Sequence, residues 1–441
     1  MRVFFSNLGC KLNQAEIDDL RRRFVAVGHG LATTLEEADL HVINSCTVTH
    51  LAARDSRKLA RRGARLGNGV RTVLTGCYAT DSAAEAAALA GVDLVVANDV
   101  KHELLDRVHT RFPELVPEPA EGIPVPYVPL AVGHARALVK VEDGCNMGCS
   151  FCIIPSTRGR QRSREVEDVV REVAQLSEGG YHEVVVTGVQ ISEYRDSQGR
   201  RLADLVAALL QETEVSRLRL TSIAPWKFDG RLLELWSDPR LCRHIHMSLQ
   251  SGCSATLRRM RRPYTASQYA ALAERLRQAI PGLALTTDVI VGFPGESDDE
   301  FAESLEFVEG MAFARPHVFT YSERAGTHAA TLGDSVPHAV KKERVHAMIA
   351  VGRQGEESFR RRHVGESLEV LWEERRGEVW SGLSDNYLRV HAPAVEGEPS
   401  RAGSLGRVRI DGVNDQALLA APETLPAAPP GEPRWVVLPS R

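Results

Sequence analysis

Three cysteines stand close together near the middle of the chain, as Cys145, Cys149 and Cys152. Three thiolates at this C-x3-C-x2-C spacing can hold three irons of a [4Fe–4S] cube and leave the fourth iron without a protein ligand. An iron that is open in this way can bind a substrate or cofactor, as the open position of a catalytic zinc does. A structural zinc site would normally have a fourth Cys or His at ligand spacing, and none follows before His182. The spacing therefore favours a reactive cluster over the alternative, three cysteines that are buried or bind zinc.

Three further cysteines, Cys10, Cys46 and Cys77, are far apart in sequence, but each follows a predicted strand. The C-terminal ends of parallel strands lie along one edge of a sheet, so the loops after them converge on a shared crevice. Three thiols in such loops can meet and hold a second iron–sulfur cluster, again with one open iron. The alternative is three buried cysteines that pack as small hydrophobic side chains, which is also how we interpret Cys242 and Cys253.

The elements that must position these cysteines begin with an α/β domain over residues 1–111. Short apolar runs alternate there with helical stretches, which is typical of a parallel sheet flanked by helices. Strands are expected at residues 2–5, 40–43, 72–74 and 92–96, with helices that include residues 15–27 and 52–66. The proline-rich residues 112–134 predict a semi-rigid linker.

Residues 135–362 continue the alternation of strands and helices. Strands are expected at residues 137–141, 183–187, 217–221, 244–248, 284–290 and 315–319. Six such repeats predict a partial TIM-type (βα)6 barrel, whose chemistry lies at the C-terminal ends of the strands. The loop with Cys145 follows the first of these strands, in agreement with that rule.

From residue 363 the pattern changes to short strands separated by turns, at residues 367–372, 379–383, 387–390 and 406–411. This pattern predicts a small β-barrel over residues 363–425. We expect the proline-rich tail, residues 426–441, to be poorly ordered.

The composition of the whole chain is that of an ordinary globular protein. It has 441 residues, of which 43% are hydrophobic and 25% charged, and its formal net charge is −4. Overall charge therefore gives no sign of a nucleic-acid partner. Since the sequence has neither an apolar signal core nor an apolar run of spanning length, we expect a cytoplasmic protein with no membrane contact. Eight cysteines in a reducing compartment indicate metal binding or catalysis rather than disulfides.

The C-x3-C-x2-C segment resembles the signature of the radical S-adenosylmethionine (SAM) enzymes. This resemblance implies that Cys145, Cys149 and Cys152 are catalytic cluster ligands and that the open iron chelates the amino and carboxylate groups of SAM. An electron from the cluster then cleaves SAM to a 5′-deoxyadenosyl radical.

Two separated cysteine triads on one chain resemble the methylthiotransferases, a subgroup of the radical SAM enzymes. The resemblance covers nearly the whole chain and is carried by NLGCKLNQAEID, INSCTVT, LTGC, VKVEDGCNMGCSFCIIPSTRGRQRSR, HIHMSLQSGC, TTDVIVGFPGE and FTYSERAGT. It implies two [4Fe–4S] clusters, two uses of SAM as methyl donor and radical source, and a C-terminal RNA-binding β-barrel of the TRAM type. It also implies an electron donor such as flavodoxin or ferredoxin, and we expect a monomer. The sequence does not reveal the sulfur source.

The residues around Cys10 bear on the substrate. The form GCKLNQ, followed by CTVT at Cys46, is most similar to the enzymes that act on N6-threonylcarbamoyladenosine beside the tRNA anticodon. At this position the isopentenyladenosine enzymes have a motif more like GCQMN. The enzymes that modify an aspartate of ribosomal protein S12 have one more like GCPKN. These two substrates remain alternatives. An alternative of another class is a non-catalytic iron–sulfur protein that binds RNA.

Residues at the strand ends of the barrel are candidates for binding SAM. Thr187, Gly188 and Gln190 follow the second strand, while Gln250 and Asp288 lie at other strand ends. For Gln250 and Asp288, a purely structural role at the rim of the barrel is an equally good interpretation. The family often has a glutamate where this chain has Ala224, so any function of that carboxylate must be supplied otherwise.

Arginine and lysine gather in three places that suit an RNA partner, although a solvated surface would look the same. These groups are Arg54, Lys58, Arg62 and Arg65 on one predicted helix face, Arg158, Arg160, Arg162 and Arg164, and Arg258, Arg259, Arg261 and Arg262. Contacts from such faces to phosphates would strengthen binding without reading sequence.

Overall fold

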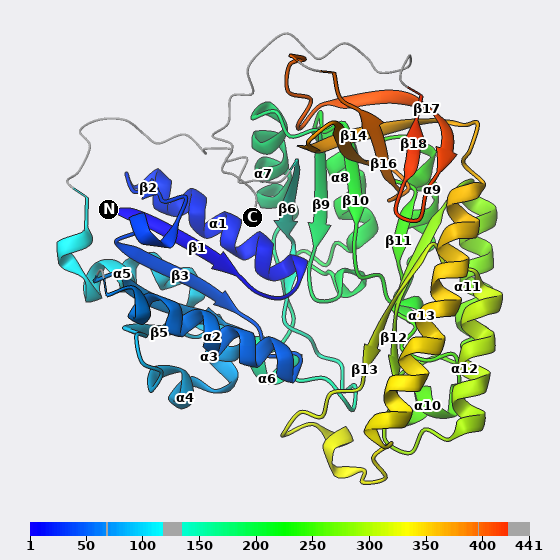
Figure 1. The fold of residues 1–441 in the computed structure, drawn as a ribbon, viewed down its shortest axis with the longest axis horizontal. Helices are drawn as coiled ribbons and strands as arrows, with labels where there is room; N and C mark the ends of the chain where they lie inside the picture. The colour runs from blue at the N-terminus through cyan, green and yellow to red at the C-terminus, as the bar shows by residue number, and fades with distance from the viewer. Residues whose placement is uncertain (68, 118–134, 396, 422–441) are drawn as a thin grey trace.

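The computed structural model describes residues 1–67, 69–117, 135–395 and 397–421 (Figure 1). Three parts of the sequence prediction fall outside these residues: positions 118–134 of the linker, positions 422–425 of the predicted β-barrel, and the tail at 426–441. None of the described helices is both long and apolar enough to cross a membrane.

The N-terminal part is a five-stranded parallel sheet with strand order β2-β1-β3-β4-β5, as the alternating pattern predicted. Its strands are β1 (Arg2–Asn7), β2 (Gly30–Leu31), β3 (Leu40–Ser45), β4 (Arg71–Gly76) and β5 (Leu94–Val96). Its helices are α1 (Lys11–Ala26), α2 (His50–Leu66), α3 (Cys77–Asp81), α4 (Ala83–Ala87) and α5 (Leu104–Arg111). Apolar residues of β1, β3 and β4, such as Val3, Val42 and Val73, form its core.

The central part is the expected partial barrel of six parallel strands. They are β6 (Arg136–Lys140), β9 (Glu183–Thr187), β10 (Arg217–Leu220), β11 (His244–His246), β12 (Ala284–Val291) and β13 (Arg315–Thr320). The strands form two sheets of three, β10-β9-β6 and β11-β12-β13. Only isolated parallel bridges, Leu218 with Leu241 and Ile223 with Met247, join β10 to β11 among the described residues.

Helices cover the outside of this barrel, because their buried faces are apolar and match the apolar strands. They are α7 (Val166–Glu178), α8 (Leu202–Glu212), α9 (Arg231–Glu234), α10 (Ser254–Arg259), α11 (Ala266–Ala279), α12 (Asp298–Met311) and α13 (His338–Arg361). Between β6 and α7 lie the short elements β7 (Glu142–Asp143), α6 (Ile154–Arg158) and β8 (Arg162–Ser163).

The C-terminal part is a closed five-stranded barrel with strand order β14-β15-β16-β18-β17. Its strands are β14 (Ser367–Arg376), β15 (Val379–Ser384), β16 (Arg389–Pro393), β17 (Leu405–Val413) and β18 (Leu418–Ala420). Trp372 and Trp380 are buried in its core rather than free to stack on bases.

This small barrel packs against the end of the large barrel at which β9, β10 and β11 begin (Figure 1). The buried Arg219 pairs with Glu183, with Nε 2.7 Å from Oε1, and also donates to the backbone oxygens of Ser384 and Asp385. The ring of Tyr387 stacks on His244 with centroids 4.2 Å apart. The two barrels thus share a buried polar interface.

Candidate functional site

The first cysteine triad lies in the loop after β7, beyond the C-terminal end of β6. Cys145, Cys149 and Cys152 are each partly exposed there. Gly144 opens the loop with a φ of +77°, and a Cβ on it would lie 2.2 Å from the backbone oxygen of Arg160. Only glycine tolerates both this conformation and this close approach, so Gly144 makes possible the turn that presents Cys145.

Hydrogen-bond donors point at all three sulfur atoms of this triad. The N–H groups of Met147 and Ile154 lie 3.4 Å from Sγ of Cys145 and Cys152, and Nη1 of Arg262 lies 3.2 Å from Sγ of Cys149. Burial raises the pKa of the Cys152 thiol to about 12, so the free thiol keeps its proton at neutral pH. A bound metal deprotonates a coordinating thiol, and donors to sulfur then stabilise the thiolate. This donor set fits an iron–sulfur cluster.

The second triad lies at one edge of the N-terminal sheet. Cys46 and Cys77 directly follow β3 and β4, and Cys10 comes three residues after β1, so the three loops leave neighbouring parallel strands. Gly9 has a φ of +108°, and a Cβ on it would lie 3.0 Å from Sγ of Cys46. The loop that carries Cys10 therefore closes directly onto Cys46, and the structure brings these two cysteines together as predicted.

The thiols of the second triad differ in exposure. Cys46 and Cys77 are buried, and Cys10 is exposed. Burial raises the pKa of the Cys46 thiol to about 11, and the neighbouring thiols of Cys77 and Cys10 add to this. Nδ2 of Asn98 lies 3.8 Å from Sγ of Cys77 and is a donor toward that sulfur. Three neighbouring thiols, of which only that of Cys10 is exposed, fit a cluster that must be accessible from solvent.

No group of three or more His, Cys, Asp or Glu side chains in the described ranges is arranged to hold a single metal ion. Our assignment of the triads rests on the placement of their loops and on the N–H donors at sulfur. A cube of four irons is larger than one ion, so its thiolate ligands stand further apart.

Three of the predicted SAM-binding residues lie together after β9. The hydroxyl of Thr187 is buried against that of Thr221. The backbone N–H of Gln190 donates to Oε2 of Glu142 at 2.9 Å, and a Cβ on Gly188 would lie 2.7 Å from the same oxygen. The sequence analysis missed Glu142. Its only sequence signal is a carboxylate at the end of a buried strand.

The other two predicted SAM-binding residues lie on the far side of the barrel. Gln250, with a φ of +72°, pairs through its backbone with Asp288 and Ile290 at 2.8 Å. Oδ2 of Asp288 lies 3.2 Å from Nε2 of His246. The contacts recorded for the described residues do not join this pair to the group after β9, so the assignment of all five residues to one SAM site stays a prediction.

Replacing Glu142 by glutamine is expected to stabilise the chain above pH 7. The Glu142 side chain is buried, its Oε1 has no hydrogen-bond partner among the described residues, and burial raises its pKa from 4.5 to about 7. The folded state therefore binds more protons than the unfolded state between those values, and stability falls as pH rises through that window, by roughly 3 kcal/mol at most. Thermal unfolding of the cluster-free protein would show the gain near pH 8 and little gain near pH 5. An equal gain at both would contradict the raised pKa.

The three predicted basic groups differ in how exposed their side chains are. Arg54, Lys58, Arg62 and Arg65 of α2 are exposed, as an RNA-binding face requires. For Arg158 the prediction is wrong. Its side chain is only 3% exposed, and Glu16 and Asp143 neutralise its charge. Arg262 is only partly exposed and contacts Cys149 and Trp226. The sequence spacing of these arginines could not show partners that lie far away in the chain.

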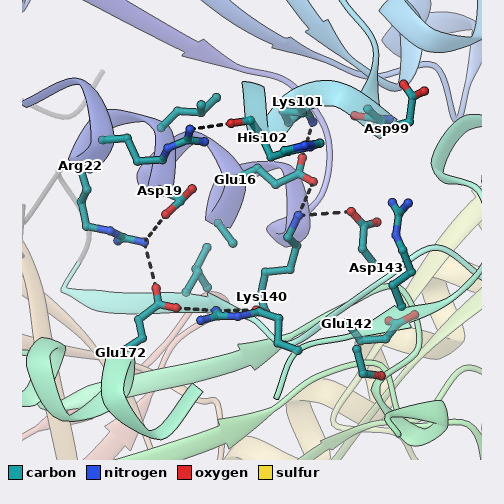
Figure 2. Close-up of a pocket in the computed structure, with 18 residues that line it drawn as sticks. Glu16, Asp19, Arg22, Asp99, Lys101, His102, Lys140, Glu142, Asp143 and Glu172 are labelled. Atoms are coloured by element: carbon teal, nitrogen blue, oxygen red, sulfur yellow. Dashed lines mark hydrogen bonds and ion pairs between the residues drawn. The ribbon is translucent and has the colours of Figure 1, made fainter. Parts of the chain in front are cut away.

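A cavity of about 520 Å³ lies between α1 and the barrel strands β6 to β8 (Figure 2). Charged side chains from both domains line it, among them Glu16, Asp19, Arg22, Lys101, Lys140, Asp143 and Glu172. Ion pairs such as Arg22 with Glu172 and Lys140 with Glu16 therefore join the two domains across this cavity.

Two models of known protein families match the parts of the chain that carry the two triads. The model of the radical SAM superfamily matches residues 139–308, and that of the uncharacterized protein family UPF0004 matches residues 2–97. The first match includes Cys145, Cys149 and Cys152, and the second includes Cys10, Cys46 and Cys77.

Individual relatives extend the similarity to nearly the whole chain. The threonylcarbamoyladenosine tRNA methylthiotransferase MtaB of Bacillus subtilis (strain 168) is 36% identical over 425 residues, which cover 92% of this chain and 93% of the relative. The tRNA-2-methylthio-N(6)-dimethylallyladenosine synthase of Geobacillus thermodenitrificans (strain NG80-2) is 32% identical over 434 residues, covering 93% and 81%. Among solved structures, the radical SAM methyltransferase TsrM of Kitasatospora setae matches 72% of each chain with a TM-score of 0.53 at 15% identity, which shows a shared fold.

Proposed function

Since the chain belongs to the radical SAM methylthiotransferase family, we propose that it adds a methylthio group to C2 of N6-threonylcarbamoyladenosine, the adenosine beside the anticodon in tRNA. The observation that carries this proposal is the similarity along nearly the whole chain to a relative named for that substrate. A relative named for dimethylallyladenosine is less similar, and isopentenyladenosine is therefore the alternative nucleoside.

The two cysteine triads provide the ligands for the cofactors that this reaction needs. Cys145, Cys149 and Cys152 would hold one [4Fe–4S] cluster, with SAM beside Thr187, Gly188 and Gln190. Cys10, Cys46 and Cys77 would hold the second. When bound, these groups supply one-electron chemistry at a carbon that has no acidic proton. The protein's own groups donate hydrogen bonds to sulfur, through Arg262 among others, and hold the loops in place.

Lys11, the residue after the first cysteine, supports the choice of nucleoside. Its Nζ lies 5.2 Å from the ring centroid of Tyr387 and also interacts with the side chains of Tyr387 and Asp288. The nearby carboxylate of Asp288 is paired with His246. A threonylcarbamoyl group ends in a carboxylate, which the Lys11 ammonium would attract, while a dimethylallyl group is a hydrocarbon. A cationic side chain at this place therefore suits the first substrate.

The exposed basic face of α2 supports tRNA as the macromolecular partner. Arg54, Lys58, Arg62 and Arg65 line the outside of the helix that begins four residues after Cys46. Contacts from this face to phosphates would hold the anticodon stem-loop near the second triad without reading its sequence. We also propose that the enzyme acts in the cytoplasm as a monomer, with a flavodoxin or ferredoxin as electron donor.

The test of the substrate is nucleoside mass spectrometry of bulk tRNA from cells that lack the gene and from the complemented strain. We expect the 2-methylthio form of threonylcarbamoyladenosine to disappear and to return on complementation. An unchanged level would reject this substrate. Loss of methylthio-isopentenyladenosine would move the reaction to that nucleoside, and unchanged tRNA would direct the search to ribosomal protein S12.

A further inference from the structure

Arg158 lies at the point where the two cysteine-bearing domains meet. It is the last residue of α6, the short helix that follows the loop of Cys145, Cys149 and Cys152, and it is 3% exposed. All of its described ion pairs and side-chain hydrogen bonds go to residues at the interface between the N-terminal sheet and the barrel.

One side of the guanidinium holds the loop of the first triad. Nη1 lies 2.9 Å from Oδ1 of Asp143, and the same carboxylate oxygen accepts the N–H of Gly144 at 2.8 Å. Gly144 directly precedes Cys145. Arg158 is therefore two hydrogen bonds away from the start of the cysteine loop.

The other side of the guanidinium holds two loops of the second triad. Nη2 lies 2.5 Å from Oδ1 of Asn13, and Nδ2 of Asn13 donates to the backbone oxygens of Leu8 and Ser45 at 2.7 and 3.1 Å. Leu8 lies two residues before Cys10, and Ser45 directly precedes Cys46. One asparagine thus ties both loops to Arg158.

The third loop is tied to the residue before Arg158. Nδ2 of Asn98 donates to the backbone oxygen of Thr157 at 2.9 Å and points at Sγ of Cys77 at 3.8 Å. The segment of Thr157 and Arg158 therefore connects to the loops of all three cysteines in the second triad, and to the first triad through Asp143.

Glu16 of α1 also holds the guanidinium of Arg158. Its carboxylate is 3% exposed and pairs with Arg158 at 2.9 Å, with Lys101 at 2.6 Å and with Lys140 at 3.2 Å. Figure 2 shows Glu16, Lys101, Lys140 and Asp143 converging from both domains on one side of the cavity. Burial alone would disfavour such charges, but the surrounding cations hold the pKa of Glu16 well below its usual range. These ion pairs and hydrogen bonds hold the Arg158 side chain in one orientation.

We propose that Arg158 is a positioning residue that sets the separation and orientation of the two cysteine triads. Its planar fork can bond to Asp143, Glu16 and Asn13 at once, which the single ammonium of a lysine cannot do in the same geometry. In a reaction that needs two reacting groups in register, a misplacement of about 1 Å can cost about 10²-fold. This inference rests on the proposed function, because it takes both triads to serve one reaction.

The test compares full-length wild type with Arg158→Lys and Arg158→Gln, and with Arg22→Gln as the matched control. Arg22 is also buried and crosses the same domain interface to Glu172 at 3.1 Å, away from the cysteine loops. The readout is the amount of methylthiolated product per 5′-deoxyadenosine formed, with iron content measured alongside. We expect this ratio to fall at least about tenfold in both Arg158 variants while SAM cleavage persists. The ratio should stay within about twofold of wild type in Arg22→Gln.

A second readout does not depend on the clusters. Hydrogen exchange of the cluster-free protein should quicken in the loops of both triads in Arg158→Lys, and in neither loop in Arg22→Gln. A wild-type ratio in an Arg158 variant that holds both clusters would overturn the proposal, as would the same fall in the Arg22 variant or unchanged exchange. If the wild type formed no product, the proposed function would fail, and the exchange data would still decide whether Arg158 joins the loops.

Discussion

Replacing Cys10, Cys46 or Cys77 by alanine is expected to stop methylthiolation while leaving the cleavage of SAM intact. The reason is spatial. These thiols lie at the edge of the N-terminal sheet, while Cys145, Cys149 and Cys152 lie in a loop of the barrel domain. Loss of one thiol would remove a ligand of the proposed second cluster, while the three thiols of the first triad stay in place. We expect product to fall to background, a loss of at least about a thousandfold.

The measurement is 5′-deoxyadenosine and modified nucleoside from the same reaction, together with iron content. Iron should fall from about eight to about four atoms per chain, since each cube holds four. Cys242→Ala is the control, because Cys242 is a 1% exposed cysteine outside both triads. It should lose some stability but neither iron nor product. Full product formation by a Cys10, Cys46 or Cys77 variant would remove the case for a second cluster.

Alanine at Cys145, Cys149 or Cys152 is expected to abolish both SAM cleavage and product. The sequence has no other cysteine between Cys77 and Cys242, so this loop carries no spare thiol to replace a missing one. Without the first cluster the radical step has no electron source, and the loss should again reach at least about a thousandfold. The variants should keep about four irons per chain in the second site.

The control for this pair of experiments is internal. Each set of variants serves as the control for the other in iron content, because the two triads lie in different parts of the chain. SAM cleavage that persists in a Cys149→Ala protein would show that the radical cluster is held elsewhere.

The barrel and the placement of the cysteine-bearing loops could be predicted, because strand patterns are local and parallel strands end at one edge of a sheet. Strand β9 is a short, fully buried run, and its bounds, Glu183–Thr187, were predicted to the residue. The loop of Cys145 follows its strand directly, and the convergence of Cys10, Cys46 and Cys77 follows from the parallel sheet. Periodicity and the geometry of parallel strands are enough for these features.

The parts that could not be predicted depend on partners distant in the chain. Arg158 looked like one member of a basic run, and nothing in its neighbourhood shows that Glu16, 142 residues earlier, would bury it. The raised pKa of Glu142 arises from burial in the folded protein, and no periodic pattern in the sequence indicates that burial. The strand β18, with three residues, is too short to have a pattern of its own, yet it closes the small barrel between β16 and β17.

The contact between the two barrels makes the C-terminal domain a fixed part of the enzyme and not an interchangeable module. Arg219 and Glu183 are wholly buried, and the remaining N–H groups of Arg219 are satisfied by backbone oxygens of the small barrel. A chimera with a foreign β-barrel would lose those acceptors and leave buried N–H groups of Arg219 without partners, at a cost of about 1–3 kcal/mol for each group. An architecture of this kind resists domain shuffling, because the small barrel can be exchanged only together with the strand ends it covers.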